Sequence, residues 1–371
     1  MAINAKVVPI SKVVAGIKAE TDGNFGVGID STGDEGTAFR QLPIVQVQKP
    51  VFNITRESRL LSGRGLVKNS NDTIITSRGG TVTMPFEMIA TPKLLSQHLA
   101  LVCQEHSEAS SYIHTHEIGG QGALLSSLGG SKTNNIPHTV NLAYEVAGVD
   151  SGEGIKVTGV VCSDLTLNLD YGTNGGNMTM SGNYFSGFSN PVSTGTCLEN
   201  SFSTGSWVAP EATGYYNIGD ISTKTLTCDD GATQDLVLKS FSVTIANGVN
   251  RVGFNSNGDA ESYSCPEYVV TGSMSIKMDD NFAYEGARNV IQDFLDGDTL
   301  PLALNIGDGT LSSVGEANIQ MNIQYTGDPA QDIGEGGIFH NLSFEGVSTG
   351  TSDNNEAFEI QIFNGESQSA W

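Results

Sequence analysis

The stretch GTVTMPFEMIATPKLLSQHLALVCQ, from Gly80 to Gln104, sets the pattern on which the whole chain can be read. Its first half alternates apolar residues with others, and the apolar positions are Val82, Met84, Phe86 and Met88. This period of two predicts a β-strand with one buried face. Thr91 and Pro92 then have the residue types of a helix N-cap and of a first helical position. The amphipathic helix of about three turns that follows has as its core positions Leu95, Leu99 and Val102.

The same pattern occurs a second time, from Val269 to Asp296, in VVTGSMSIKMDDNFAYEGARNVIQDFLD. Apolar residues alternate up to Met278, a cluster of Asp and Asn interrupts the pattern, and helical spacing follows. The core positions of this second helix are Val290, Ile291 and Phe294. A strand that leads into a helix, twice in one chain, indicates an internal duplication.

The composition supports a mainly β protein with two short helices. The chain has 371 residues, beyond the usual size of one core, so two domains are expected. Glycine is frequent at 45 residues and charged residues are few at 16%, which favours many short strands joined by turns over a helical bundle. No apolar run is long enough to span a membrane, and the first residues lack the apolar core of a signal peptide. We therefore expect assembly in a cytoplasm.

The net charge of −23 argues against two kinds of partner. Proteins that wrap nucleic acid need a basic surface, and anionic membrane surfaces would repel this chain. The five cysteines form no CxxC motif, and their odd number leaves at least one thiol free of any internal disulfide. Cys197 and Cys228 flank one irregular segment, so a disulfide between them and two free thiols are both compatible with the sequence.

The duplication divides the chain into four segments. Residues 1–42 are expected to form an N-terminal arm, 43–188 a first domain, 189–235 an interdomain connection and 236–371 a second domain. The clearest hairpin is predicted over residues 164–181, with Gly175 and Gly176 in its turn. Its counterpart in the second half is expected to pair residues 341–347 with 357–365.

Two further segments have unusual side chains. A long loop before the first strand–helix pair is basic, with Arg56, Arg59, Arg64, Lys68 and Arg78. A loop of this length in a compact domain is usually functional. The predicted strand over 317–325 carries on one face an unbroken row of amides, Asn318, Gln320, Asn322 and Gln324. Such an uncharged polar row suits a strand that lines a water-filled channel.

The order of elements resembles that of the tail tube proteins of tailed bacteriophages, over roughly residues 43–188 and 236–366. SDLTLNLDYGTNGGNMTMSGNYFSG, at 163–187, looks like a hairpin of that family. The resemblance implies duplicated tail-tube-type domains, each a β-sandwich or curved sheet, whose strands close into a β-barrel ring on oligomerisation. Two-domain members of the family form trimers that imitate hexamers.

The resemblance also implies a role and partners. The chain would be a structural virion protein, assembled in the bacterial host cytoplasm into trimeric rings that stack into a tail tube. Genomic DNA would pass through the lumen without specific binding, and terminator, tape measure and baseplate or tip proteins would contact the tube. Residues 56–78 would be the inter-ring loop of the first domain and 247–267 that of the second. The amide row of 318–324 would face the lumen, and no cofactor is implied.

Candidate chemical sites are weak. His114 and His116 share a strand face, and with Glu117 and His106 a zinc site is conceivable, but a half-exposed polar strand explains them better. Asp279 and Asp280 precede a helix, where carboxylates favour the N-terminal dipole, so a calcium site is not needed to explain them. No nucleophile elbow, phosphate loop or EF-hand spacing is present. We therefore expect no enzyme activity and no metal site.

Two other functions remain open on the sequence alone. A β-rich surface binding module, such as an adhesin or a lectin, would suit the glycine, Asn and Thr content. The absence of a signal peptide and the repeated helix argue against it. A polysaccharide lyase would need a strand-rich solenoid with a site of carboxylates and bases, which the sequence does not suggest.

Overall fold

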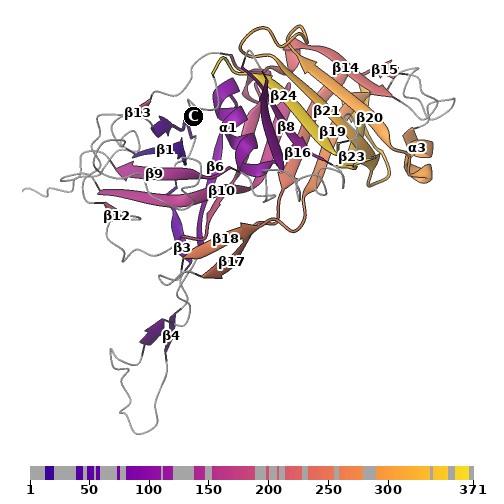
Figure 1. Cartoon of the computed structure of the whole chain (residues 1–371). Helices are drawn as coiled ribbons and strands as arrows, with labels where there is room; N and C mark the ends of the chain where they lie inside the picture. Colours follow the sequence, from indigo (N-terminus) through magenta and orange to yellow (C-terminus); the bar gives the residue numbers. More distant parts are fainter. Residues whose placement is uncertain are drawn as a thin grey trace, which may run out of the picture.

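The computed structural model shows a mainly β protein with short helices (Figure 1). The residues that it describes are 13–20, 39–44, 48–53, 56–58, 73–75, 81–109, 112–119, 138–146, 153–188, 198–199, 207–208, 214–227, 233–254, 259–278, 290–334, 337–349 and 356–366. All structural statements below concern these residues.

The first unit is built on four antiparallel strands that lie edge to edge. In order they are β3 (Val51–Asn53), β6 (Thr81–Ile89), β11 (Thr179–Ser186) and the second half of β10 (Glu153–Asp170). The first half of β10 pairs instead with β9 (Val140–Val146), and from there the order continues through β1 (Val13–Ala19), β2 (Phe39–Gln41) and the parallel β13 (Trp207–Val208). The long strand β10 therefore belongs to two layers.

The second unit repeats this arrangement. Its four antiparallel strands are β16 (Leu238–Ala246), β19 (Val269–Lys277), β23 (Gly337–Gly346) and β22 (Ala330–Gly334). The strand before β22 is β21 (Ala317–Tyr325), which belongs to the second layer of this unit. From β21 the order in that layer continues through β20 (Leu300–Ile306), β14 (Ile221–Thr227) and β15 (Thr233–Asp235). Together β21 and β22 correspond to β10.

Individual positions support this correspondence. Val160 of β10 pairs with β9 on one edge and with β11 on the other, and Ile323 of β21 pairs in the same way with β20 and β23. A further strand lies on the second edge in each unit, β12 (Leu198–Glu199) beside β10 and β24 (Phe358–Phe363) beside β21. The long loops each contain a separate hairpin, formed by β4 (Arg56–Ser58) with β5 (Thr73–Ile75) and by β17 (Asn250–Phe254) with β18 (Ala260–Ser264).

The two units are joined edge to edge. β10 pairs with β16 from Asp164 opposite Ala246 to Asp170 opposite Ser240. This join creates one antiparallel sheet of eight strands, which we call the bridging sheet, in the order β3, β6, β11, β10, β16, β19, β23 and β22. Among the described residues the strand pairs branch but never return to their starting strand, so the sheet is open. β3 and β22 are its two ends.

The structure corrects the expected hairpin of the second half. Residues 341–347 do not pair with 357–365, because β23 pairs with β22, from Ala330 opposite Asn341 to Gly334 opposite Gly337. β24 lies between β21 and a strand of the first unit, β8 (Ile113–Ile118), which in turn pairs with β7 (Glu105–Ala109). Strand spacing alone does not show which of several alternating segments are partners.

Several strands lie in segments that we expected to be irregular, and the longest of them are β1 and β14. β1 falls within 1–42 and pairs with β9 along its whole length, and β14 falls within 189–235 and pairs with β20. They occupy corresponding places in the two units. The short helical turns Asn174–Gly176 and Ile218–Asp220 lie next to each other, joined by a bridge between Asn177 and Asn217.

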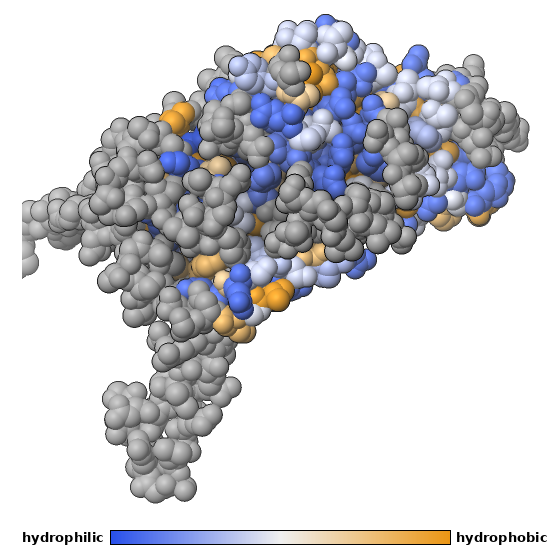
Figure 2. All heavy atoms as spheres, in the orientation of Figure 1, coloured by the Kyte–Doolittle hydropathy of each residue, from blue (hydrophilic) through white to orange (hydrophobic). Residues whose placement is uncertain are grey.

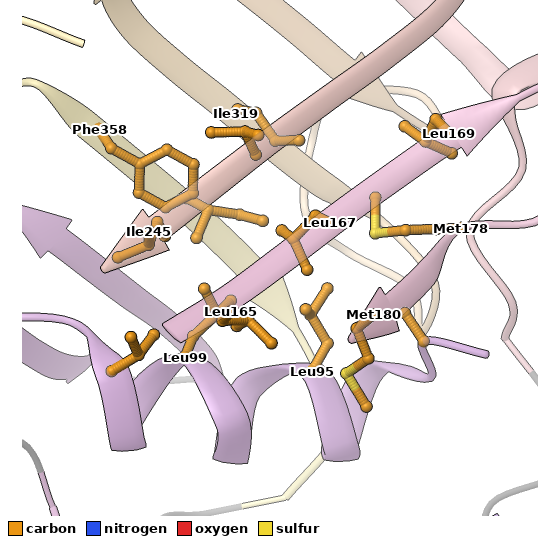
Figure 3. Packing of buried hydrophobic residues seen from close by; sticks show 14 of the residues in the cluster. Leu95, Leu99, Leu165, Leu167, Leu169, Met178, Met180, Ile245, Ile319 and Phe358 are labelled. Atoms are coloured by element: carbon orange, nitrogen blue, oxygen red, sulfur yellow. The ribbon is translucent and has the colours of Figure 1, made fainter. Parts of the chain in front are cut away.

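Helix α1 (Pro92–Val102) begins where the sequence predicts, with Thr91 as N-cap and Pro92 in its first turn. Leu95 and Leu99 point toward Leu165 and Leu167 of β10, and Ile319 and Phe358 of the second unit lie beyond them (Figure 3). One apolar cluster therefore includes residues of both units. At roughly 1.5–3 kcal/mol for each buried large apolar side chain, this shared core favours a fixed arrangement of the two units.

The second helix, α3 (Val290–Asp296), covers less of the core than α1 does. Val290 is fully buried, while Ile291 and Phe294 are partly buried. Leu295 is 67% exposed, so one apolar residue of this helix faces solvent. α3 and α1 follow corresponding strands, β19 and β6.

Candidate functional site: the polar face of the bridging sheet

The bridging sheet has one apolar face and one polar face. Its apolar face packs into the core, for example through Met84, Leu167 and Val243. The opposite face, which we call the polar face, carries hydroxyl and amide side chains on strands of both units. They are Thr81, Thr83, Thr166, Asn168, Thr179, Ser181, Asn183, Ser240, Ser242, Thr244, Thr271, Ser273, Asn341 and Ser343.

The strand register places these side chains in rows that cross the join between the units. One row runs from Glu87 on β6 to Glu345 on β23 and contains in between Ser181, Thr166, Thr244 and Thr271. At the join itself the hydroxyls of Thr166 and Thr244 are hydrogen-bonded at 2.8 Å. The polar face is therefore continuous from one unit to the other.

Among the described residues, carboxylates outnumber cations on this face. The acidic residues at its outward positions are Glu87, Asp164, Asp170, Asp332 and Glu345, against Lys239 and Lys277. Asp164 is held in place, since its carboxylate accepts hydrogen bonds from Asn183 Nδ2 at 3.1 Å and from Ser163 Oγ at 2.8 Å. A surface of this kind offers hydrogen bonds and little positive charge.

Two observations describe the shape of the face. A hollow of about 320 Å³ lies over β6, β11 and β10 and includes Glu87, Asp164 and Asn183 in its lining. At the other end Lys239 Nζ of β16 lies 3.1 Å from Asp332 Oδ2 of β22, three strands away. In a flat sheet those strands would be roughly 14 Å apart, which exceeds the reach of the two side chains. The sheet therefore curves toward its polar face at this end.

The amide row predicted to face a lumen lies elsewhere, on β21. Asn322 is 7% exposed and donates to the carbonyl oxygen of Glu356 at 3.0 Å. Asn318 donates to the Gly309 carbonyl, and Gln324 donates to Thr299 Oγ1, while Gln320 is exposed. These amides mostly satisfy local backbone and hydroxyl groups, so they do not form a uniform exposed row.

The basic loop is placed only at its ends. Arg56 begins β4, whereas Arg59, Arg64, Lys68 and Arg78 lie outside the described residues. The predicted helix core positions Leu95, Leu99 and Val102 are buried. Asp279, Asp280, Cys197 and Cys228 also lie outside the described part of the chain.

The histidines of the conceivable zinc site do come together. His106 Nε2 and His114 Nδ1 are 3.1 Å apart, and the ring of His106 stacks on those of His114 and His116. Stacked rings direct their nitrogen lone pairs along parallel planes and do not converge on one ion. Within the described ranges no group of three or more His, Cys, Asp or Glu side chains has the geometry to hold a metal.

The polar face is not among the sites predicted from the sequence. Its signal is present in segments such as SFSVTIA, where Ser and Thr occupy every second position of a strand whose other positions are apolar. Alternation identified the buried face, and the composition of the opposite face was not used. Its continuity depends on the β10–β16 join, which no local pattern shows.

Comparison with known proteins adds no assignment, because neither a protein family nor a curated protein matches the sequence. None of the described helices is both long and apolar enough to cross a membrane. Exposed apolar atoms on the side of the molecule seen in Figure 2 form small patches, one of them where β17 and β18 run.

Proposed function

We propose that the chain is the subunit of a tube built from stacked rings, of the kind found in the tails of bacteriophages, with three copies in each ring. The observation that carries this proposal is the edge-to-edge join of two units with the same strand order. The join is head to tail, since β10 of the first unit meets β16, the counterpart of β3. A head-to-tail contact can be repeated, and it forms a ring when its rotation closes.

The ends of the bridging sheet are the edges that such a repetition needs. β22 corresponds to the second half of β10, and no described strand pairs with its outer edge. β3 corresponds to β16, and no described strand pairs with its outer edge either. Free strand edges favour pairing with another chain. β22 of one copy would thus pair with β3 of the next, as β10 pairs with β16 inside the chain.

The internal join also predicts the register between copies. Ala330 lies opposite Asn341 as Thr166 lies opposite Ser181. Asn341 on β23 and Ser181 on β11 are the same number of residues away from the partners of Ile323 and Val160, which correspond to each other. Ala330 therefore corresponds to Thr166. By the same comparison through β6 and β19, Val51 corresponds to Thr244. Because Thr166 lies opposite Thr244, Ala330 should lie opposite Val51, which is 51% exposed in the single chain. Two residues further along the strands, Asp332 should lie opposite Lys49.

The polar face would then line the lumen. Basic side chains dominate the affinity of proteins for DNA, and this face presents mostly hydroxyls, amides and carboxylates. DNA would therefore pass along it without being held. The net charge of −23 acts in the same direction. This assignment moves the lumen from the amide row of β21 to the bridging sheet.

A disulfide between copies tests the proposal and its register. The double variant Val51→Cys with Ala330→Cys places two thiols opposite each other in neighbouring copies, close enough to form a disulfide. We expect oxidation to give covalent species of up to three chains on a non-reducing gel, with rings in electron micrographs. The matched control, Phe52→Cys with Ala330→Cys, moves one thiol to the other face of the sheet and should cross-link much less. Oxidised material that stays monomeric at high concentration, or rings of six chains by native mass spectrometry, would contradict it.

A further inference from the structure

A group of four histidines, three of them buried, lies where the end of the second unit attaches to the first. It consists of His106 on β7, His114 and His116 on β8, and His138 just before β9. His114 and His116 are 0% exposed and His106 is 6% exposed. We call this group the histidine cluster.

The attachment itself consists of a strand pair and one carboxylate. β24 of the second unit pairs with β8 from Phe358 opposite Ile118 to Phe363 opposite Ile113. Beyond β24, the carboxylate of Glu366 forms ion pairs with Arg40 of β2 and Lys93 of α1. We call β24 together with residues 364–366 the C-terminal segment.

The hydrogen bonds at this attachment are satisfied when the rings are neutral. His114 Nε2 donates to the Glu366 carbonyl oxygen at 2.8 Å, so Nδ1 of the same neutral ring is an acceptor, and His106 Nε2 donates to it at 3.1 Å. His116 Nε2 lies 3.0 Å from Ser96 Oγ of α1. No described residue accepts a hydrogen bond from His116 Nδ1, which is buried.

We propose that the histidine cluster is an acid-sensitive latch, in which protonation of its imidazoles releases the C-terminal segment from the first unit. A proton added to His116 at Nδ1 would bury a charged donor that has no acceptor. Each proton also repels its neighbours, because the rings are stacked.

The charged and titratable groups around the cluster set the pH range. On β7, Glu108 lies opposite His114. Glu366, whose backbone carbonyl accepts the hydrogen bond of His114, carries a carboxylate that is paired with Arg40 and Lys93. From β24 the cluster meets the apolar Ile360 and Ile362. Three carboxylates, of Glu105, Glu117 and Glu359, lie side by side on the opposite face of these strands. Carboxylates ordinarily titrate near pH 4 and the histidines of an unfolded segment near 6.5, so a falling pH acts on the attachment first through the histidines.

The direction of the pH effect follows from the pKa of His116 in the folded state. Burial, and then the neighbouring His106, His114 and His138, lower the pKa of His116 well below its ordinary value. A histidine with a lowered folded pKa stabilises the attachment above its unfolded pKa of about 6.5 and loses that contribution as the pH falls. The latch is therefore closed at neutral pH and weakens in acid.

Hydrogen–deuterium exchange of the full chain measures the latch directly. Exchange is compared between pH 7.5 and 5.5, after correction for the intrinsic exchange rate. Once one cluster histidine begins to take up a proton, the protection of peptides from β24 and β8 should fall about tenfold for each further unit of pH. Peptides of β14 and β20, whose strand partners include no histidine, report on the rest of the core and should keep their protection over this range.

Substitutions separate the cluster from other buried histidines. His116→Gln removes one titrating ring and should reduce the acid response of β24, whereas His340→Gln alters a fully buried histidine of β23 and should leave that response intact. Unchanged protection of β24 in the wild-type chain down to pH 5.5 would overturn the proposal, whatever the variants do. An equal acid response in wild type and His116→Gln would also overturn it. These readings do not depend on whether the chain forms rings.

Discussion

At the scale of single residues, one polar pair is built into the apolar core beneath α1. His98 Nδ1 donates to the Leu94 carbonyl oxygen at 2.6 Å, so its Nε2 accepts the hydrogen bond from the hydroxyl of Tyr184, 2.5 Å away. The ring of Phe86 packs on both, with ring centroids 5.0 Å from His98 and 4.4 Å from Tyr184. The pair fixes α1 to β11 and has every ring heteroatom satisfied.

Removing the hydroxyl of this pair should cost stability. Tyr184→Phe leaves Nε2 of His98 buried without a donor, and such a group costs roughly 1–3 kcal/mol. Urea denaturation should show a midpoint lowered accordingly. Tyr171→Phe removes a hydroxyl from a residue that is 56% exposed and should change the midpoint little. Equal midpoints for the two variants would show that the pair contributes nothing.

The same pair makes the core sensitive to acid. Burial lowers the pKa of His98 to about 4. Because the unfolded chain takes up a proton near pH 6.5, stability from this residue is present above that pH and falls as the pH drops toward 4, by roughly 3 kcal/mol in all. His98→Gln should flatten this part of the pH dependence of unfolding. A stability that is constant from pH 6.5 to 4.5 in the wild-type chain would contradict the assignment.

A glycine marks a second position where one residue decides the packing. A Cβ on Gly272 of β19 would lie 2.4 Å from the ring of Phe344 on β23, its partner in the register. The ring covers the bare backbone, as aromatic residues do beside glycines in designed sheets. Gly272→Ala should therefore destabilise the chain by about 1–3 kcal/mol, whereas Gly327→Ala, where a Cβ meets no atom within 4 Å, should be nearly neutral. Thermal unfolding of both variants distinguishes the two sites.

At the scale of elements, the strand–helix pair β6–α1 could be predicted because its signals are local. Alternation, an N-cap and a proline lie within one short stretch, and the buried positions match the predicted ones. The partners of β24 could not be predicted, since β7 and β8 exist only in the first unit and the sequence gives no sign that they receive a strand from the second. β1 and β14, of seven residues each, were missed because VVAGIKA and ISTKTLT show no alternation of apolar and polar residues.

The two helices offer matched positions for a test of burial. Leu99 of α1 is 0% exposed and Leu295 of α3 is 67% exposed. Leu99→Asp should bury an unpaired charge and cost several kcal/mol, enough to leave much of the chain unfolded or insoluble. Leu295→Asp should remain folded with a nearly unchanged melting temperature. Similar behaviour of both variants would mean that the packing of α1 has been misplaced.

At the scale of the whole molecule, charge placed at the two ends of the bridging sheet should decide whether copies join. Lys49→Glu would place a carboxylate opposite that of Asp332 at the contact between copies. Exposed pairs contribute only about 0–1 kcal/mol each, but each ring repeats the contact three times. We expect fewer rings by native mass spectrometry for Lys49→Glu, and recovery in Lys49→Glu with Asp332→Lys. Failure of the double variant to recover would reject the register.

Contacts between stacked rings are a separate expectation. Rings of such negative charge repel each other, and the basic loop of residues 56–78 is the part of the chain best suited to offset this repulsion. Arg59→Glu with Arg64→Glu should leave rings intact while stopping their growth into tubes, as seen by electron microscopy. Tubes of normal length that form at the wild-type rate would show that stacking depends on other residues.

The hairpin β7–β8 has a consequence for the outside of such a tube. It lies with α1, on the side of the core away from the polar face, and the second unit passes from α3 to β20 through residues 297–299 without a counterpart. Around a ring of three copies, a raised ridge would therefore alternate with a bare position. The inner surface of the ring would have approximate sixfold symmetry. A protein that binds the outer wall would instead meet three ridges and three positions without a ridge. Duplication within one chain thus permits inner and outer surfaces with different symmetry.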